Sequence, residues 1–284
     1  MITIFTSPKP FTDRHINMIQ RNAIKSWSML KPKPEIIIVG DEEGTEEVCK
    51  EFSLKHIKEV EKNKYGTPIL RSIFGSSQKI AKNSIMCYIN CDIILMNDFI
   101  IAVKKVLERF DDKFLIIGQR WDVDIDFEIN FNDGWEEQIR NYALKKGKLH
   151  PHTGIDFFVF RKGQYMDIPP LIFARCMWDN WLVYKAKKDK IPVIDVTESA
   201  TIIHQNHDYS HLRWSNPYKN PESIYNLKLV GGYEYAYTVI DANYKLEKGK
   251  IVRKAPSLYT IFYKIKRKFK FYKLKRFIKN IIYG

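Results

Sequence analysis

The first 118 residues alternate between short apolar runs and stretches in which apolar residues recur at helical spacing. Runs of about five apolar residues are typical of strands buried on both faces of a parallel sheet. We expect strands at Ile2–Thr6, Glu35–Val39, Lys55–Ile57, Ile85–Ile89 and Lys113–Ile117. Between them we expect helices over residues 13–30, 45–52, 66–82 and 99–110. This alternation predicts an α/β fold, in which a mostly parallel central sheet carries helices on both faces.

The pattern after residue 118 is less regular. We expect helices over residues 134–146 and 176–187, strands over residues 155–160, 191–196 and 201–204, and then a long polar, aromatic loop. The length of 284 residues suits one large domain with an appendage. We divide the chain into a body over residues 1–247, with halves 1–118 and 119–247, and a tail over residues 248–284.

The charge is concentrated in the tail. The formal net charge is +14, and no acidic residue follows Glu247, whereas thirteen Lys and Arg do. Subtracting these thirteen charges leaves the first 247 residues at +1. A nucleic-acid enzyme would extend its basic surface onto the folded body, so the neutral body argues against a nucleic-acid partner.

The tail also has a helical hydrophobic pattern. Its first apolar stripe consists of Leu258, Ile261, Phe262, Ile265, Phe269 and Tyr272, and a second stripe over residues 274–282 is rotated by about half a turn. This predicts two short amphipathic helices, or one helix with a break near residues 270–273. Basic residues beside an apolar stripe suit an anionic membrane surface, which residues 258–283 would contact. The alternatives are docking on the chain's own core, pairing of two copies, and a nucleic-acid arm.

The remaining composition favours a cytosolic protein. The four cysteines form no CxxC pair, which is typical of reduced core thiols. The N-terminus shows a strand-like run instead of a charged-then-apolar leader, and no stretch approaches the ~18–20 apolar residues that span a bilayer. We therefore expect a cytoplasmic protein that is peripheral on the inner face of the membrane.

The segment Asn90-Cys91-Asp92 interrupts the most apolar part of the chain. A carboxylate directly after a buried strand is costly unless the strand has reached the edge of the sheet. In open α/β sheets, ligands bind at the carboxyl ends of the strands. Asp92 is therefore the best-placed acidic residue to hold a metal at a substrate phosphate, the alternative being a turn cap before Ile93.

With Asp41 after the second strand and Asp92 after the fourth, residues 1–210 resemble the GT-A class of nucleotide-sugar glycosyltransferases, close to the family 2 type. The resemblance implies an acidic residue that contacts the nucleotide, here Asp41, and a DxD motif that binds Mn²⁺ or Mg²⁺ and the donor diphosphate. The motif here begins with Asn, so Asp92 keeps the metal and Asn90 serves the ribose or a metal-bound water. Thr6, at the end of the first strand, and Arg71, which would neutralise the diphosphate, complete the predicted donor site.

The resemblance also implies a carboxylate base near the start of a helix in the second half. The matching residue is Asp179, with Trp178 in the place of the family's usual Glu. Trp178 and Trp181 would form a stacking platform for a sugar ring. Asp156 is the rival acid and would lie near the acceptor or donor sugar. The alternative for Asp179 is a helix N-cap.

Two further positions carry predicted roles. Many GT-A enzymes bring a late His to the metal, and His204, directly after a short strand, is the first candidate, with His207 the second. The histidine spacing matches no structural zinc motif, and the alternative is a loop of hydrogen-bonding histidines. Arg120, at the end of the fifth strand, would contact the donor or acceptor.

The sequence thus predicts a metal-dependent glycosyltransferase. It would move a sugar from a nucleotide-diphosphate sugar, UDP favoured, to a hydroxyl acceptor, with inversion and Asp179 as base. The tail suggests a glycan or lipid-linked acceptor at the membrane, such as a lipopolysaccharide, capsule or glycolipid precursor. A sugar-nucleotide nucleotidyltransferase is disfavoured because the loop after the first strand, TSPKPF, has no glycine. A non-catalytic membrane- or nucleic-acid-binding protein that acts through the tail is the other alternative. The donor sugar, the acceptor, inversion versus retention at the anomeric centre, and the choice between monomer and homodimer stay open.

Overall fold

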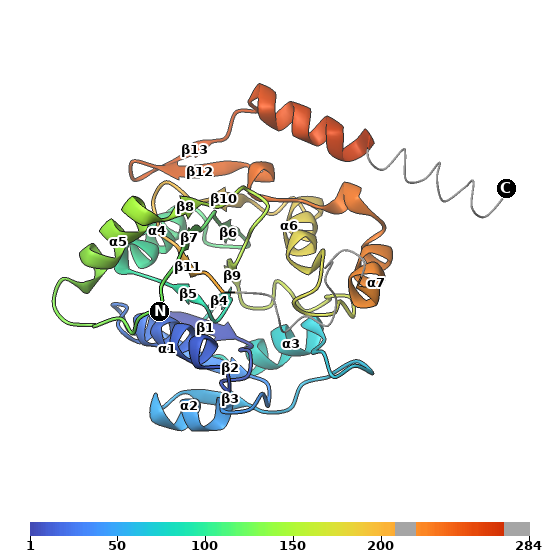
Figure 1. Ribbon diagram of the computed structural model, residues 1–284. Helices are drawn as coiled ribbons and strands as arrows, with labels where there is room; N and C mark the ends of the chain where they lie inside the picture. The colour runs from blue at the N-terminus through green and yellow to red at the C-terminus, as the bar shows by residue number, and fades with distance from the viewer. Residues whose placement is uncertain (208–219, 270–284) are drawn as a thin grey trace.

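The computed structural model describes residues 1–207 and 220–269, and within them the strands form a nine-stranded sheet and a four-stranded sheet (Figure 1). The large sheet has the order β13-β12-β10-β6-β9-β4-β1-β2-β3. Its strands are β1 Ile2–Thr6, β2 Glu35–Val39, β3 Lys55–Ile57, β4 Ile85–Ile89, β6 Leu115–Ile117, β9 Phe157–Arg161, β10 Val193–Asp195, β12 Tyr244–Glu247 and β13 Lys250–Arg253.

The expected strands of the first half are all present in the large sheet. β1 pairs in parallel with both β2 and β4, and β2 pairs in parallel with β3. β9, from the second half, lies between β4 and β6 and is antiparallel to both. The large sheet is therefore mixed, although the strands of the first half all run in one direction.

The residues of the central strands alternate between two hydrophobic cores. In β4, Ile85, Cys87 and Ile89 pack into one core, and Met86 and Tyr88 pack into the other. This is the twofold alternation of a strand buried on both faces. The helices follow the same division and cover both faces: α1 Arg14–Ser28, α2 Thr45–Glu51 and α4 Asn97–Leu107 pack into the first core, and α3 Leu70–Ile80 and α6 Trp178–Lys188 pack into the second.

A small sheet that the sequence pattern did not predict combines one strand of the first half with three strands of the second half. Its order is β5-β11-β7-β8, from β5 Ile93–Ile94, β11 Ile203–Gln205, β7 Trp121–Val123 and β8 Lys148–Leu149. Helix α5 Trp135–Lys146 packs with β5, β7 and β11 in a third core. His204 lies inside β11 and not directly after a short strand, because β11 continues to Gln205.

The predicted boundary at residue 247 falls inside a hairpin. β12 and β13 pair antiparallel, with Glu247 opposite Lys250, so the first residues of the predicted tail belong to the large sheet. A helix over residues 258–269 follows and lies beyond this edge of the sheet, at the top of Figure 1. Helix α7 Pro221–Val230 replaces part of the expected long loop. Tyr272 and the second stripe at 274–282 lie outside the described residues.

None of the helices in the described part of the chain is both long enough and apolar enough to cross a membrane.

Candidate active site

A cavity of about 1140 Å³ opens where several strands and loops of the two sheets end. Its lining brings together residues that are far apart in the sequence. They include Ser7 and Lys9 after β1, Asn90 and Asp92 after β4, His204 in β11, and Asp179 in the first turn of α6. The cavity therefore contains most of the candidate residues found in the sequence, and its position follows the rule for α/β sheets.

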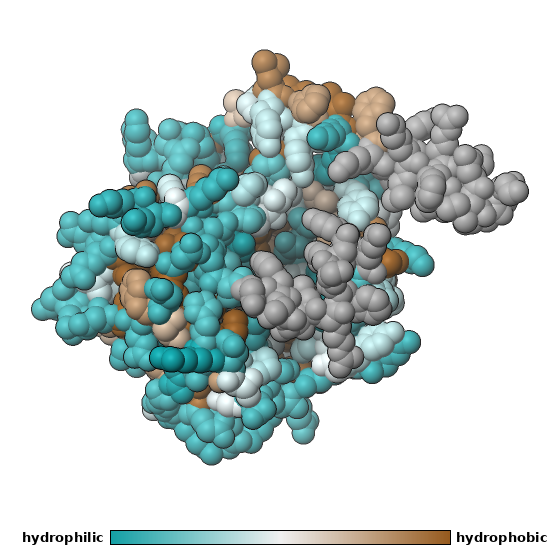
Figure 2. All heavy atoms as spheres, in the orientation of Figure 1, coloured by the Kyte–Doolittle hydropathy of each residue, from teal (hydrophilic) through white to brown (hydrophobic). Residues whose placement is uncertain are grey.

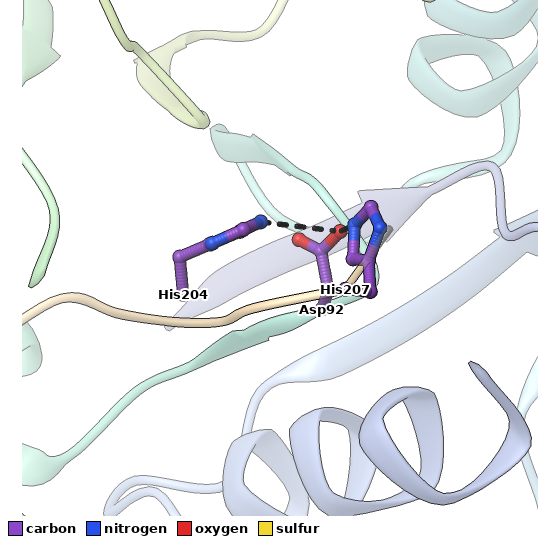
Figure 3. Close-up of side chains that lie close together, drawn as sticks. All are labelled: Asp92, His204 and His207. Carbon is purple, nitrogen blue, oxygen red and sulfur yellow. Dashed lines mark hydrogen bonds and ion pairs between the residues drawn. The ribbon is translucent and has the colours of Figure 1, made fainter. Parts of the chain in front are cut away.

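Three of these side chains form a cluster that could hold a metal ion. One ligand atom each from Asp92, His204 and His207 lies within 4.8 Å of the others. The Asp92 Oδ2 atom is 3.2 Å from Nε2 of His207 and 3.8 Å from Nε2 of His204. Figure 3 shows both imidazole rings beside the Asp92 carboxylate.

Strand pairing explains how the chain brings these residues together. β5 begins directly after Asp92, and its Ile93 pairs antiparallel with His204 of β11. The backbone N–H of Gln205 also donates to the Asp92 carbonyl oxygen, at 3.2 Å. The pairing of β5 with β11 thus fixes His204 beside Asp92, and strands hold a site more rigidly than loops do, whereas His207 follows the end of β11.

The electrostatics of Asp92 favour its charged form. Burial by itself would raise its pKa, but the nearby charge of His204, the hydrogen bond with His207 and the charge of Lys9 hold the pKa of this carboxyl well below its usual range. The buried Oδ1 atom of Asp92 has no hydrogen-bond partner among the described residues. A buried carboxylate oxygen without a partner is costly, so it points to a missing ligand.

The donor set of this cluster fits a divalent metal. It offers one carboxylate oxygen and two imidazole nitrogens. Mg²⁺ strongly prefers oxygen ligands, whereas imidazole nitrogen suits first-row transition ions. The residues present therefore fit Mn²⁺ better than Mg²⁺.

His204 is oriented by a second carboxylate that the sequence reasoning did not single out. Asp122 in β7 lies with Oδ1 3.4 Å from Nδ1 of His204 and with Oδ2 2.5 Å from Nδ1 of His150. Burial opposes the charged imidazole of His204, but Asp92 and Asp122 outweigh it and raise the pKa of His204. A carboxylate behind a ligating imidazole fixes its orientation and strengthens it as a ligand. The parallel pairing of Asp122 with His204 places this carboxylate.

Arg120 joins this group to the predicted sugar-binding acid. Its guanidinium donates to Asp122 Oδ1 at 2.8 Å and to Asp156 Oδ2 at 2.6 Å. Asn90 donates from Nδ2 to the other Asp156 oxygen, at 2.7 Å. Asn90, Arg120 and Asp156 all line the cavity, so these three predicted residues lie together. Their mutual pairing makes the floor of the site a fixed polar surface.

Lys9 is a site residue that the sequence reasoning missed. Its Nζ lies 2.9 Å from Nε2 of His207, beside the predicted metal ligands. The loop that carries it, SPKPF, lacks the glycines of a phosphate loop, so its lysine did not stand out. A cation in this position is suited to bind a phosphate of the donor.

Asp179 lies in a contrasting environment of the same cavity. It is the second residue of α6, whose N-cap position is occupied by Met177 with φ 77°, so Asp179 is not the N-cap. Burial raises the pKa of Asp179 to about 7, and the charge of Asp156 adds to the effect, against the backbone N–H groups of the helix start and Arg120. A non-glycine residue at positive φ is uncommon and often marks a functional turn.

The tryptophans beside Asp179 are largely core residues. Trp178 is buried, packs 5.2 Å from the ring centroid of Tyr88, and presents part of its side chain to the cavity. Trp181 is buried in the same core and is not among the lining residues. The predicted platform of two tryptophans is therefore corrected to one, because the helix turns Trp181 into the core.

Three predicted donor residues do not line the cavity. Asp41 is paired with Lys62, and Arg71 is paired with Glu61 at 2.6 Å on an exposed surface. Thr6 is fully buried within β1, and its neighbour Ser7 lines the cavity instead.

The lining of the cavity includes an acid and an arginine that the sequence reasoning did not find. Glu42 lines it one residue after Asp41. Arg175 lines it as well and is held by Glu222 at 2.6 Å. Tyr263 and Arg267 of the helix over 258–269 are further lining residues that the sequence reasoning did not find.

No family model matches the sequence, and no curated protein matches it. A search of solved structures gives TarS residues 1–349 from S. aureus in complex with UDP-GlcNAc, with a TM-score of 0.52 and 11% identity over 81% of this chain and 65% of that one. The chain has the GT-A fold. It spans less than two thirds of the length of that TarS fragment.

Two other glycosyltransferases are similar at a lower score. The mannosyltransferase PcManGT from Pyrobaculum calidifontis, in complex with GDP-Man and Mn²⁺, has a TM-score of 0.46 and 10% identity over 74% of this chain and 58% of that one. Glucosyl-3-phosphoglycerate synthase from Mycobacterium tuberculosis, with Mn²⁺, UDP and phosphoglyceric acid, has a TM-score of 0.47 and 14% identity over 74% of this chain and 72% of that one. The GT-A fold explains why the cavity lies at the ends of β1 and β4.

Proposed function

We propose that this protein is a metal-dependent glycosyltransferase that moves a sugar from a nucleotide-diphosphate sugar to a hydroxyl acceptor. The observation that carries the proposal is the cluster of Asp92, His204 and His207, whose buried Asp92 Oδ1 has no partner among the described residues. Asp179, a carboxyl with the pKa of a base that works near neutral pH, lines the same cavity. A metal ion can stabilise a departing diphosphate and a base can deprotonate an acceptor hydroxyl, so a metal site and a base in one cavity suit glycosyl transfer to a hydroxyl.

The cluster would serve the leaving group. When bound by Asp92, His204 and His207, a divalent ion would neutralise the charge that develops on the diphosphate. Lys9 would add a second positive charge beside it, and Arg175 would take the role predicted for Arg71. Asn90, Arg120 and Asp156 would hold the sugar or ribose hydroxyls, because their fixed polar groups face the cavity.

Asp179 would act on the acceptor. Its carboxylate accepts the proton of the acceptor hydroxyl while the hydroxyl oxygen forms a bond to the anomeric carbon. The bond from that carbon to the diphosphate breaks, and the diphosphate leaves with the electron pair. Attack from the face opposite the leaving group inverts the anomeric centre, so this assignment predicts an inverting enzyme.

The donor and acceptor classes extend the proposal. We favour a UDP-sugar, in line with the UDP-GlcNAc bound by TarS, and Mn²⁺ as the ion. The acceptor would be a glycan or lipid-linked precursor at the cytoplasmic face of the membrane, supported by the basic tail with no acidic residue after Glu247. A homodimer stays a prediction, as does the absence of a nucleic-acid partner.

Isothermal titration of the purified protein with UDP-, GDP-, CMP- and TDP-sugars, with and without Mn²⁺, tests the proposal. We expect one nucleotide to bind only with the metal, and Asp92→Ala to abolish that binding. Asp126→Ala is the matched control, because Asp126 is an exposed acid that does not line the cavity. If a well-folded protein binds none of these donors, the glycosyltransferase proposal is wrong.

A further inference from the structure

The helix over residues 258–269 turns its apolar stripe toward solvent. Leu258, Phe262 and Phe269 are 87%, 63% and 68% exposed, and Ile261 and Ile265 are also exposed. Figure 2 shows these hydrophobic residues gathered at the top of the molecule, where the helix lies. A contiguous apolar patch of this kind on a folded protein marks an interaction surface.

The opposite side of the same helix is attached to the body through polar and aromatic groups. Arg267 forms a two-point ion pair with Asp241, at 2.8 and 3.1 Å, and its guanidinium lies 4.1 Å from the ring centroid of Tyr237. The ring of Tyr263 packs 4.5 Å from that of His152. The apolar stripe is therefore not what docks this helix on its own core, which leaves the stripe available for a partner.

The inward side of the helix is also a wall of the cavity on the side of the predicted base. Tyr263 and Arg267 are both lining residues. Asn180, next to Asp179, donates from Nδ2 to the Tyr237 carbonyl oxygen at 2.9 Å, and the Tyr237 ring supports Arg267. The helix that presents the apolar stripe is thus tied to the part of the cavity where the acceptor hydroxyl would meet Asp179.

The charges around the helix over residues 258–269 indicate which kind of partner its apolar stripe would contact. A hollow of about 260 Å³ at its inner edge is lined by four cations, namely Lys187, Arg253, Lys254 and Lys264. Asp241, which also lines the hollow, is already paired with Arg267, and Lys254 is paired with Asp195 at 2.7 Å. Lys266 and Lys268 add two positive charges on the helix itself. Basic groups around an apolar stripe match an anionic lipid surface in both charge and hydrophobicity.

We infer that the helix over residues 258–269 is a two-sided membrane contact. Its apolar stripe lies in the surface of an anionic phospholipid bilayer, and its inward residues Tyr263 and Arg267 hold the acceptor side of the cavity beside that surface. The acceptor is then an amphiphile whose polar head enters the cavity from the bilayer. The part of this inference that concerns the acceptor rests on the proposed glycosyl transfer, whereas the membrane contact does not.

Sedimentation of the full chain with vesicles tests the contact. We expect binding to vesicles that contain phosphatidylglycerol, and little binding to vesicles of phosphatidylcholine alone. The double variant Phe262→Ser/Ile265→Ser should lower the partition coefficient about tenfold or more, because two apolar side chains no longer enter the lipid. Ile101→Ser/Met166→Ser is the matched control, since Ile101 and Met166 are 60% and 62% exposed but lie on other elements, and it should bind like the unaltered chain.

A fluorescent probe reports on the same surface directly. An environment-sensitive dye on Phe262→Cys should shift its emission to the blue on anionic vesicles, and the dye on Met166→Cys should not. Equal binding by the double variant, or no shift at residue 262, would overturn the inference. Equal binding to both lipids would refute the role of charge. A dimer that the double variant dissociates, without vesicle binding, would assign the stripe to a second copy.

Titration of the same proteins with UDP-sugar and Mn²⁺ separates this inference from the proposed function. If the donor binds but the vesicles do not, the membrane contact is wrong and the proposed reaction stands. If the vesicles bind through the stripe but no nucleotide sugar binds, the reaction is wrong and the contact stands.

Discussion

The two key carboxylates of the cavity, Asp92 and Asp179, have opposite environments. Both are removed from bulk water, which by itself raises the pKa of each. Around Asp92 the histidines and Lys9 reverse this effect and hold its pKa well below the usual range. Around Asp179 burial is reinforced by Asp156, and the pKa rises to about 7. One carboxylate stays charged, as the proposed metal ligand must, and the other can take up and release a proton near neutral pH.

This difference shows that neighbouring charges, more than burial, separate the pKa values of Asp92 and Asp179 and with them their proposed roles. Other enzymes follow the same pattern, in which two carboxylates of one site have separated pKa values and serve different steps. Strand pairing brings His204 to Asp92, because His204 lies opposite the residue that follows Asp92, whereas Lys9 and His207 come from the segments after β1 and β11. Around Asp179, the backbone N–H groups of the helix start and the charge of Arg120 lower the pKa, but they do not offset burial and Asp156. Substitution of Asp92 and substitution of Asp179 should therefore affect different measured quantities.

The largest effect is expected for Asp92→Asn. The change keeps the shape of the side chain but removes the charged ligand, so metal-dependent turnover should fall by about a thousandfold or more, since a bound ion contributes several kcal/mol. The measurement is release of the nucleoside diphosphate from the donor identified by titration. Asp126→Asn should keep full activity. If Asp92→Asn keeps activity near that of the unaltered protein, Asp92 is not a metal ligand.

A smaller effect is expected for Asp179→Asn, and it should appear in kcat and not in donor binding. The loss of a general base should lower kcat by about 10²–10⁴-fold. The donor and metal should bind as before, because Asp179 is not part of the cluster formed by Asp92, His204 and His207. Titration and steady-state kinetics on one preparation separate the two outcomes. A loss of donor binding equal to the loss in kcat would place Asp179 at the donor instead.

The pH dependence of kcat/KM in the unaltered enzyme tests the same difference between Asp92 and Asp179. A base with a pKa of about 7 is protonated and inactive in acid, so kcat/KM should rise about tenfold per pH unit below pH 7 and level off above it. Asp92 stays charged throughout this range because its pKa is lowered. In Asp179→Asn the rise with its midpoint near pH 7 should disappear. If the variant keeps that midpoint, another group is the base.

The raised pKa of Asp179 should also make the free energy of unfolding depend on pH. The carboxyl has a pKa of about 7 in the folded protein and an ordinary value of 3.8, so the folded state binds the proton more tightly. The free energy of unfolding therefore falls as the pH rises from about 4 to about 7, and the destabilisation by Asp179 is complete above that range. Asp179→Asn should be more stable than the unaltered protein by roughly 1–3 kcal/mol at pH 8. Urea unfolding at pH 8 and pH 4 should show that this difference vanishes in acid.

The sequence predicted the sheet better than it predicted the site. Strands such as Ile85–Ile89 are five-residue apolar runs, which periodicity detects, and the structure confirms them. The strands β5, β7 and β8 have two or three residues, which is too short for any period to appear. β5 and β7 pair with β11, and β8 pairs with β7, and the local pattern does not contain these long-range contacts.

The same reason governs the site residues. Asp92, His204, His207 and Asp179 were found because each stands at a recognisable point of the resemblance, next to a strand or helix. Lys9 was missed and Asp122 received no role of its own, because the position of each in the site depends on the distant groups that it faces. Within the described residues, the helix over 258–269 has the predicted apolar stripe, but this stripe faces solvent while Arg267 docks on Asp241, a pairing that the sequence pattern could not indicate.

The smallest effect is expected at an arginine that the sequence favoured. Arg71 is half-exposed and pairs with Glu61 outside the cavity, and an exposed ion pair of this kind contributes about 0.2–1 kcal/mol at most. Arg71→Ala should therefore leave donor affinity within about twofold. Arg175→Ala should weaken donor binding clearly more, because Arg175 lines the cavity. Titration of both variants with the same donor compares them, and a greater loss at Arg71 would mean that the donor lies on the Glu61 side of the fold.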